Sequence, residues 1–188
     1  MTNILTAASY CRRLYRIERQ KNVPEAALQY FLYLAQMESL AQFDKPLFEE
    51  ELIAGETGPY FPIVATSHND ESDYSIMELP QLLPQEKYLL EKTIKLYAKK
   101  PLSTLRDLVC RNKSWIRARE RGEMEGEDNP KIELEDIRRD AMRVRMVDAI
   151  WMQNKEESDD NRQRKARLER KRRGEPLIEE LAEEEPAA

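Results

Sequence analysis

Histidine and cysteine are scarce in this chain of 188 residues, which contains one histidine, His68, and two cysteines, Cys11 and Cys110. Neither cysteine belongs to a C-x-x-C pair, so the sequence offers no motif for a tetrahedral metal site. We expect two reduced thiols, as in a cytosolic protein, with a single disulfide as the alternative. The sequence predicts no metal and no other cofactor.

Long apolar runs are absent as well. No stretch approaches the roughly 18 apolar residues that a membrane-spanning helix requires. The first residues, MTNILTAASYCRRLYRIERQ, lack the basic start and apolar segment of a signal peptide. We therefore expect a soluble, cytoplasmic protein that has no membrane partner.

Charge is abundant and unevenly distributed. Charged residues make up 36% of the chain, against about 25% in an average protein, so part of the chain must be solvated. The net charge of -5 disfavours nucleic acid as the main partner of the whole molecule. A basic block at 162–173 is followed by an acidic block at 175–185, and such blocks are typical of solvated segments. We predict a domain over 1–152 and a charged extension, helical or disordered, over 153–188.

Helical periodicity covers most of the predicted domain. Residues 4–19 form an amphipathic pattern with Thr2 or Asn3 as the N-cap. Residues 25–42 are apolar on nearly all faces, which predicts a helix in the centre of the core. The sequence thus predicts a mainly α, compact multi-helix domain, in which 49–53 is either a strand or a helix and a short strand fits near the Gly-Pro turn.

The second half of the domain is predicted to contain three more helices. Pro84 lies near the start of the first, and Ser103 is the expected N-cap of the second. Residues 120–130, ERGEMEGEDNP, have the composition of a loop. The expected inward-facing residues are Leu89, Leu90, Thr93, Leu96 and Tyr97 in the first helix and Leu134, Ile137, Ala141, Val144 and Trp151 in the last.

No motif in the chain predicts catalysis. The stretch GETGPYFP, 55–62, is not a phosphate loop, because it lacks the required lysine and Pro59 has no N–H. Ser67, His68 and Asp70 are interpreted as part of a surface loop over 65–75. Three consecutive carboxylates at 49–51 cannot all point into one site and are interpreted as a solvated face. We predict that the protein is not an enzyme; a hydrolase or nuclease ranks behind the two functions given below.

Several stretches, taken together, resemble the Panacea domain family of SocA-like antitoxins, also known as phage-associated GepA-like proteins. The matching segments are LQYFLYLAQ (28–36), FDKPLFEEEL (43–52), GETGPYFPIV (55–64), LSTLRDLVCRNKSWIRARERG (102–122) and IELEDIRRDA (132–141). The resemblance covers residues 3–150. The chain departs from the family pattern at Gln29-Tyr30, at Ala54 or Gly55, and at Cys110-Arg111.

The resemblance implies an antitoxin that neutralises a cognate protein toxin by direct binding, with one family branch acting as an adaptor for a bacterial protease. It leaves the oligomeric state open. Aromatic residues near the Gly-Pro turn would be the buried contacts of such an interface. The alternative is that these side chains pack in the core, which the residue types favour for two of them, Phe48 and Trp115. The candidate partner-binding residues are Tyr60, Phe61, Pro59, Phe48 and Trp115.

A second interpretation is a phage or mobile-element regulator that binds nucleic acid through its basic tail. Basic side chains bind phosphates without sequence preference, and such binding weakens with salt. No aromatic residues are interleaved in this block for base stacking. The candidate residues are Arg162, Arg164, Lys165, Arg170 and Arg172.

Overall fold

The computed structural model describes residues 2–67, 82–143 and 145. The contacts divide the chain into two units, Met1–Arg145 and Met146–Ala188, and only the first contains described residues. The predicted extension over 153–188 and the predicted core residues Val144 and Trp151 therefore lie outside the described residues.

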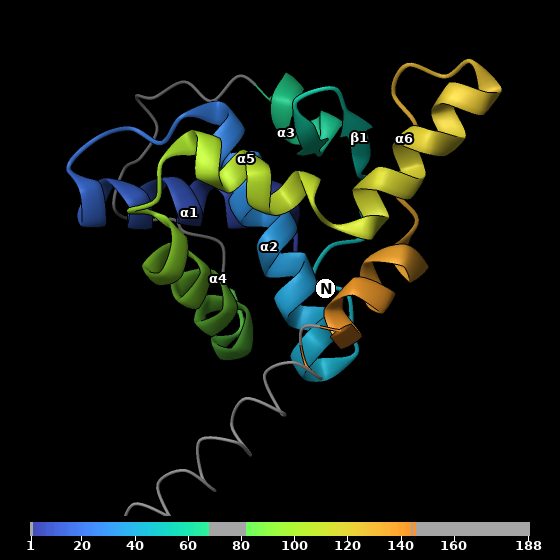
Figure 1. The fold of residues 1–188 in the computed structure, drawn as a ribbon. Helices are drawn as coiled ribbons and strands as arrows, with labels where there is room; N and C mark the ends of the chain where they lie inside the picture. Colours follow the sequence, from blue (N-terminus) through green and yellow to red (C-terminus); the bar gives the residue numbers. More distant parts are fainter. Residues whose placement is uncertain (1, 68–81, 144, 146–188) are drawn as a thin grey trace, which may run out of the picture. The chain divides into compact units, whose positions relative to one another are not determined.

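The first unit is mainly helical, as the sequence predicts, and its described part contains one short hairpin (Figure 1). A last helix begins at residue 134 and is described through 143. The named elements are α1 (Ile4–Arg19), α2 (Glu25–Phe43), β1 (Ile53–Gly55), β2 (Gly58–Tyr60), α3 (Pro62–Thr66), α4 (Pro84–Tyr97), α5 (Leu102–Cys110) and α6 (Lys113–Glu125).

Helix α2 is the centre of the core. It packs against α1, α4, α5 and β2 (Figure 1), and its side chains are buried on several faces. This confirms the prediction from the apolar composition of 25–42, because a helix that is hydrophobic all round must be covered all round. Among its aromatic residues, Phe31 and Tyr33 have no exposed surface.

Two helix starts show how local sequence sets the boundaries. Asn3 is the N-cap of α1, and its Oδ1 accepts hydrogen bonds from the N–H groups of Leu5 at 2.9 Å and Thr6 at 3.2 Å. The N-cap predicted at Ser103 is wrong, because α5 already begins at Leu102 after Pro101. Proline fixes its own φ near the helical value, so a helix starts readily beside it.

Three other predictions are corrected. Leu96 of α4 is 51% exposed, and Ile94 is buried instead. Leu134, predicted to face inward, is 36% exposed at the first residue of the last helix, where Ile137 is buried. The loop predicted at 120–130 is helical as far as Glu125. Its composition misled the interpretation, because Gly122 serves close packing here: a Cβ at Gly122 would lie 2.7 Å from Pro130 Cγ.

Candidate functional site

Two buried glutamines of α2 hold the segments that lead into and out of the hairpin. Gln36 Oε1 accepts hydrogen bonds from the N–H groups of Leu47 at 2.7 Å and Phe48 at 2.9 Å. Its Nε2 donates to the Phe48 carbonyl at 3.0 Å. Gln29 Oε1 accepts from the Phe61 N–H at 2.8 Å, and its Nε2 donates to the Phe61 carbonyl at 3.5 Å. Each amide thus satisfies backbone groups as a neighbouring strand would.

The sequence interpretation missed this glutamine pair (Gln29 and Gln36) because it considered 25–42 by hydrophobicity alone. Seven positions separate the two residues, so they lie about two helical turns apart on one face. Buried amides need hydrogen-bond partners. Two glutamines at this spacing within the apolar run 26–37 are the signal that could have revealed them.

The Gly-Pro turn itself is a tight antiparallel hairpin. Gly55 of β1 pairs with Gly58 of β2, which leaves Glu56 and Thr57 as the two turn residues. Gly58 has φ +138°, and a Cβ there would lie 2.7 Å from Cε1 of Tyr30. The hydroxyl of Tyr30 donates to the Thr57 carbonyl at 2.6 Å. The turn is therefore a structural element packed closely on α2.

Helix α6 and the segment after it hold the other side of the hairpin. Trp115 Nε1 donates to the Gly55 carbonyl at 3.2 Å, and Arg119 donates to the Ala54 carbonyl at 3.2 Å. The Ala54 N–H in turn donates to the Pro130 carbonyl at 2.8 Å, and the Ile132 N–H donates to the Leu52 carbonyl, also at 2.8 Å. Strand β1 is therefore bonded along both edges, to β2 on one side and to 130–132 on the other.

The five candidate partner-binding residues fall into two groups. Phe48 and Phe61 lie in the core, with 2% and 1% of their surface exposed, and their rings meet edge to face at 5.7 Å. Pro59 is buried as well, whereas Tyr60 and Trp115 are half-buried. In this fold Phe48, Phe61 and Pro59 lie below the surface rather than on it, although Phe48 and Phe61 also border a neighbouring pocket. They stabilise the hairpin from within, and only Tyr60 and Trp115 retain exposed surface.

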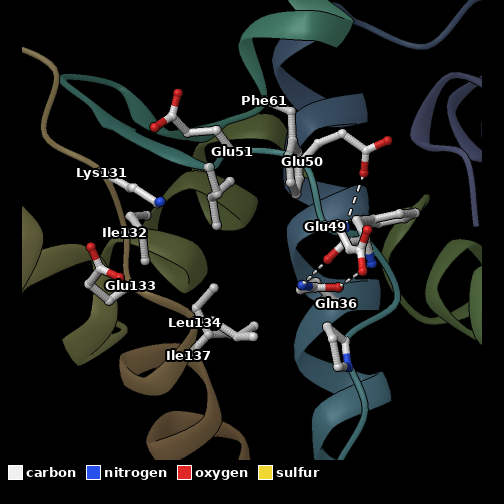
Figure 2. Close-up of a pocket in the computed structure, with 13 residues that line it drawn as sticks. Gln36, Glu49, Glu50, Glu51, Phe61, Lys131, Ile132, Glu133, Leu134 and Ile137 are labelled. Atoms are coloured by element: carbon white, nitrogen blue, oxygen red, sulfur yellow. Dashed lines mark hydrogen bonds between the residues drawn. The ribbon is translucent and has the colours of Figure 1, made fainter. Parts of the chain in front are cut away.

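A pocket of about 310 Å³ lies beside these buried rings. Figure 2 shows Gln36 and Phe61 on one side and Ile132, Leu134 and Ile137 on the other. The stretches that form it, 46–52 and 131–137, are far apart in the sequence and are brought together by the pairing of β1 with 130–132. Its size is at the lower end of small-molecule pockets, which are roughly 300–1,000 Å³.

The pocket has an apolar floor and an acidic rim. The floor consists mainly of buried apolar side chains, with half-buried Pro46 and exposed Leu134 beside them. Glu49, Glu51, Glu133 and Lys131 are exposed at the rim. Glu50 also lines the pocket, but its Oε1 accepts from the Ile4 N–H at 3.3 Å at the start of α1. The prediction that 49–51 is simply a solvated face is thus refined: the three carboxylates border a pocket, and one of them is bonded to a helix terminus.

A buried carboxylate holds the 131–137 wall in place. Asp136 is in the first turn of the last helix, and its side chain is only 8% exposed. It accepts from Arg117 at 2.9 Å and Arg121 at 3.2 Å, and Arg139 lies at 3.6 Å. Arg121 also donates to the Lys131 carbonyl at 3.0 Å. The network connects α6 to the wall of the pocket.

Replacing Asp136 with asparagine is expected to lower the free energy of unfolding by about 2 kcal/mol, because the guanidinium groups lose their buried counter-charge. The matched control is Glu135→Gln, since Glu135 is 57% exposed yet also pairs with Arg138 and Arg139. An exposed pair contributes little, so the control should change stability by less than about 0.5 kcal/mol. Urea denaturation measures both, and equal effects would contradict the structural role of Asp136.

Neither thiol forms a disulfide, in agreement with the expectation of reduced cysteines. Burial raises the pKa of Cys11 to about 12. Burial also raises the pKa of Cys110, against the opposing effect of Arg106. Since the thiolate is the reactive form, neither cysteine is activated as a nucleophile at neutral pH.

Other candidates from the sequence lie partly or wholly outside the described residues. Ser67 is described and donates to the Val64 carbonyl at 2.8 Å, whereas His68 and Asp70 are not described. The candidate nucleic-acid residues also lie outside: Arg162, Arg164, Lys165, Arg170 and Arg172. Within residues 2–67, 82–143 and 145, no three acidic, histidine or cysteine side chains are grouped to hold a metal ion. None of the helices in that part has the length and apolar character needed to cross a membrane.

Comparison of the chain with family models, curated proteins and solved structures found no match.

Proposed function

We propose that this protein is a cytoplasmic antitoxin that neutralises a cognate protein toxin by direct, stoichiometric binding. The observation that carries the proposal is the convergence of the stretches that resemble the Panacea family. Gln36 and Gln29, from 28–36, bond to Phe48 and Phe61 in two other stretches, and Trp115 bonds to Gly55. Residues that are distant in sequence thus build one hydrogen-bonded unit around the hairpin.

The buried polar side chains of this unit are already bonded to backbone groups, which supports a role in binding rather than in catalysis. The side-chain amides of the glutamine pair are buried and bonded to backbone groups, as is the indole N–H of the half-buried Trp115. They stiffen the hairpin, on which Tyr60 and Trp115 keep some exposed surface, and the segments that border the acidic-rimmed pocket. A surface that is ordered before binding loses less entropy when a partner docks.

The test is co-expression of the full-length chain with the product of the neighbouring gene. We expect that product to arrest growth when it is expressed alone, to be harmless beside this chain, and to elute with it as one complex. If the chain acts as an adaptor for a protease, the half-life of the toxin should also shorten in its presence. A neighbouring product that is harmless alone, or that stays toxic beside this chain, contradicts the proposal.

Nucleic-acid binding through the basic block at 162–173 is the second candidate, motivated by its eight basic residues. We would compare the full chain with a variant in which its five candidate residues are replaced by glutamine. Binding to duplex DNA should weaken steeply with salt in the native chain, with a slope of about -0.9 per phosphate contacted. The variant should lose this dependence. No binding by the native chain at low salt removes the candidate.

A further inference from the structure

We propose that the acidic-rimmed pocket (about 310 Å³, between 46–52 and 131–137) receives one arginine side chain of the protein partner. The inference rests on the proposed function and specifies what the partner must present. It follows from the apolar floor, the charges at the rim, and the arrangement of those charges.

The floor suits the apolar stem of a long side chain. Half-buried Pro46 and exposed Leu134 give the pocket accessible apolar surface. Beneath them lie the buried side chains of Phe48, Leu52, Phe61, Ile132 and Ile137. Arginine buries its methylene groups against apolar surface while its charged end stays at the polar boundary. A pocket of this size is large enough for one such side chain but small for a whole helix or strand.

The rim suits a cation. The pocket is lined by four glutamates and one lysine, Lys131. Among the described residues, no ion pair includes Glu49, Glu51, Glu133 or Lys131. The negative charge at the rim is therefore not compensated by an ion pair within the described part of the fold, and it would attract a positively charged group to the mouth.

The arrangement of the carboxylates favours a guanidinium over a metal ion. Calcium and magnesium need several oxygens that converge on one point, and no such group of side chains occurs in the described part of the chain. Guanidinium is planar and weakly hydrated, and it directs five N–H donors outward. It can therefore bond with two N–H groups to a single rim carboxylate, for which Glu51 and Glu133 are the candidates.

The first experiment needs no partner. Butylguanidinium, which has the apolar stem and the charged end of arginine, is titrated into the ¹⁵N-labelled full-length protein and followed by NMR. Butylurea is the neutral control of the same shape. We expect butylguanidinium to shift the backbone amides of Glu51, Ile132 and Glu133, and butylurea to bind at least about tenfold more weakly because it lacks the charge.

Variants assign the binding to the rim. The double variant Glu51→Gln/Glu133→Gln should weaken butylguanidinium binding by about tenfold, because it removes both candidate carboxylates and with them the charged hydrogen bonds. Lys131→Ala should strengthen it by about twofold, because it removes a like charge from the mouth. Glu120→Gln/Glu125→Gln is the matched control: both residues are exposed on α6, neither lines the pocket, and binding should be unchanged.

Three outcomes would overturn the assignment. Butylurea could bind as tightly as butylguanidinium, the shifts could map outside the pocket, or no shifts could occur up to the solubility of the probe. A fourth would also overturn it: concentration-dependent shifts of the same amides without any probe would show that a second copy of the chain fills the pocket.

The failure of this inference is distinguishable from that of the proposed function. If the double variant captures and neutralises the toxin as well as the native chain does, the antitoxin function stands and the arginine pocket is rejected. If the pocket binds butylguanidinium but the chain neutralises no toxin, the recognition of a guanidinium stands and its assignment to a toxin is rejected.

Discussion

Replacing Gln36 with methionine is expected to lower the free energy of unfolding by about 4 kcal/mol, because three buried backbone groups lose their partner. These groups are the N–H groups of Leu47 and Phe48 and the Phe48 carbonyl. Each unsatisfied buried group costs roughly 1–3 kcal/mol, and water that enters from the neighbouring pocket relieves part of the sum. Methionine has nearly the same shape, so the variant removes the hydrogen bonds while it keeps the packing.

Two further substitutions on α2 calibrate this result. Gln29→Met should cost about 2 kcal/mol, because the Phe61 N–H is the one buried backbone group with a short bond to its side chain. The other bond of Gln29, to Glu25 at 3.3 Å, involves an exposed side chain. Gln42→Met should cost less than about 0.5 kcal/mol, because Gln42 is not buried and bonds to the side chain of Glu38 rather than to backbone. Urea denaturation of the full-length proteins gives all three values. A Gln36 variant as stable as the Gln42 variant would refute the role of the glutamine pair.

Replacing Gly58 with alanine is expected to cost about 3 kcal/mol, through backbone strain together with a steric clash. The strain arises from φ +138°, which residues with a side chain rarely adopt, and the clash from the new methyl group 2.7 Å from Tyr30 Cε1. Because Tyr30 lies on the buried central helix, its ring has little room to move away.

Gly126 provides the matched control for this substitution. It also has a positive φ, +73°, but a Cβ there would meet no atom within 4 Å. Gly126→Ala should therefore cost only the backbone strain, about 1 kcal/mol. A double-mutant cycle isolates the clash. When Gly58→Ala is made in a Tyr30→Ala background, the loss of unfolding free energy caused by Gly58→Ala should be smaller by more than about 1 kcal/mol. If the two glycine variants are equally stable, the close contact with Tyr30 is not what requires glycine at 58.

Local sequence predicted α1 and α2 well. In α1 the apolar spacing and the N-cap Asn3 are local signals, and in α2 the apolar composition on nearly all faces is one. The prediction failed at 120–125 because glycine and charge are typical of loops, whereas a side chain at Gly122 would collide with the Glu127 carbonyl at 2.6 Å and with Pro130 at 2.7 Å. That requirement depends on a neighbour outside the helix, which no local pattern shows.

The candidate site could be predicted only in part, since its parts are far apart along the chain. The aromatic residues near the Gly-Pro turn were identified from the sequence, and their residue types favoured the core for Phe48 and Trp115. Only the structure shows that Phe61 also faces inward and that Trp115 stays half exposed. The pairing of β1 with 130–132 places Glu133 at the rim of the same pocket as Glu51. Nothing in the run of three glutamates indicates that Glu50 bonds to the Ile4 N–H.

The sequence by itself determined a mainly α domain with one central helix, because the burial of apolar faces follows from periodicity along a single segment. Only the tertiary structure decided which backbone groups the two glutamines satisfy, why Gly58 must be glycine, and which carboxylates border one pocket. The physical reason is that hydrogen bonds, close contacts and local charge depend on distances between segments, and those distances exist only once the chain has folded.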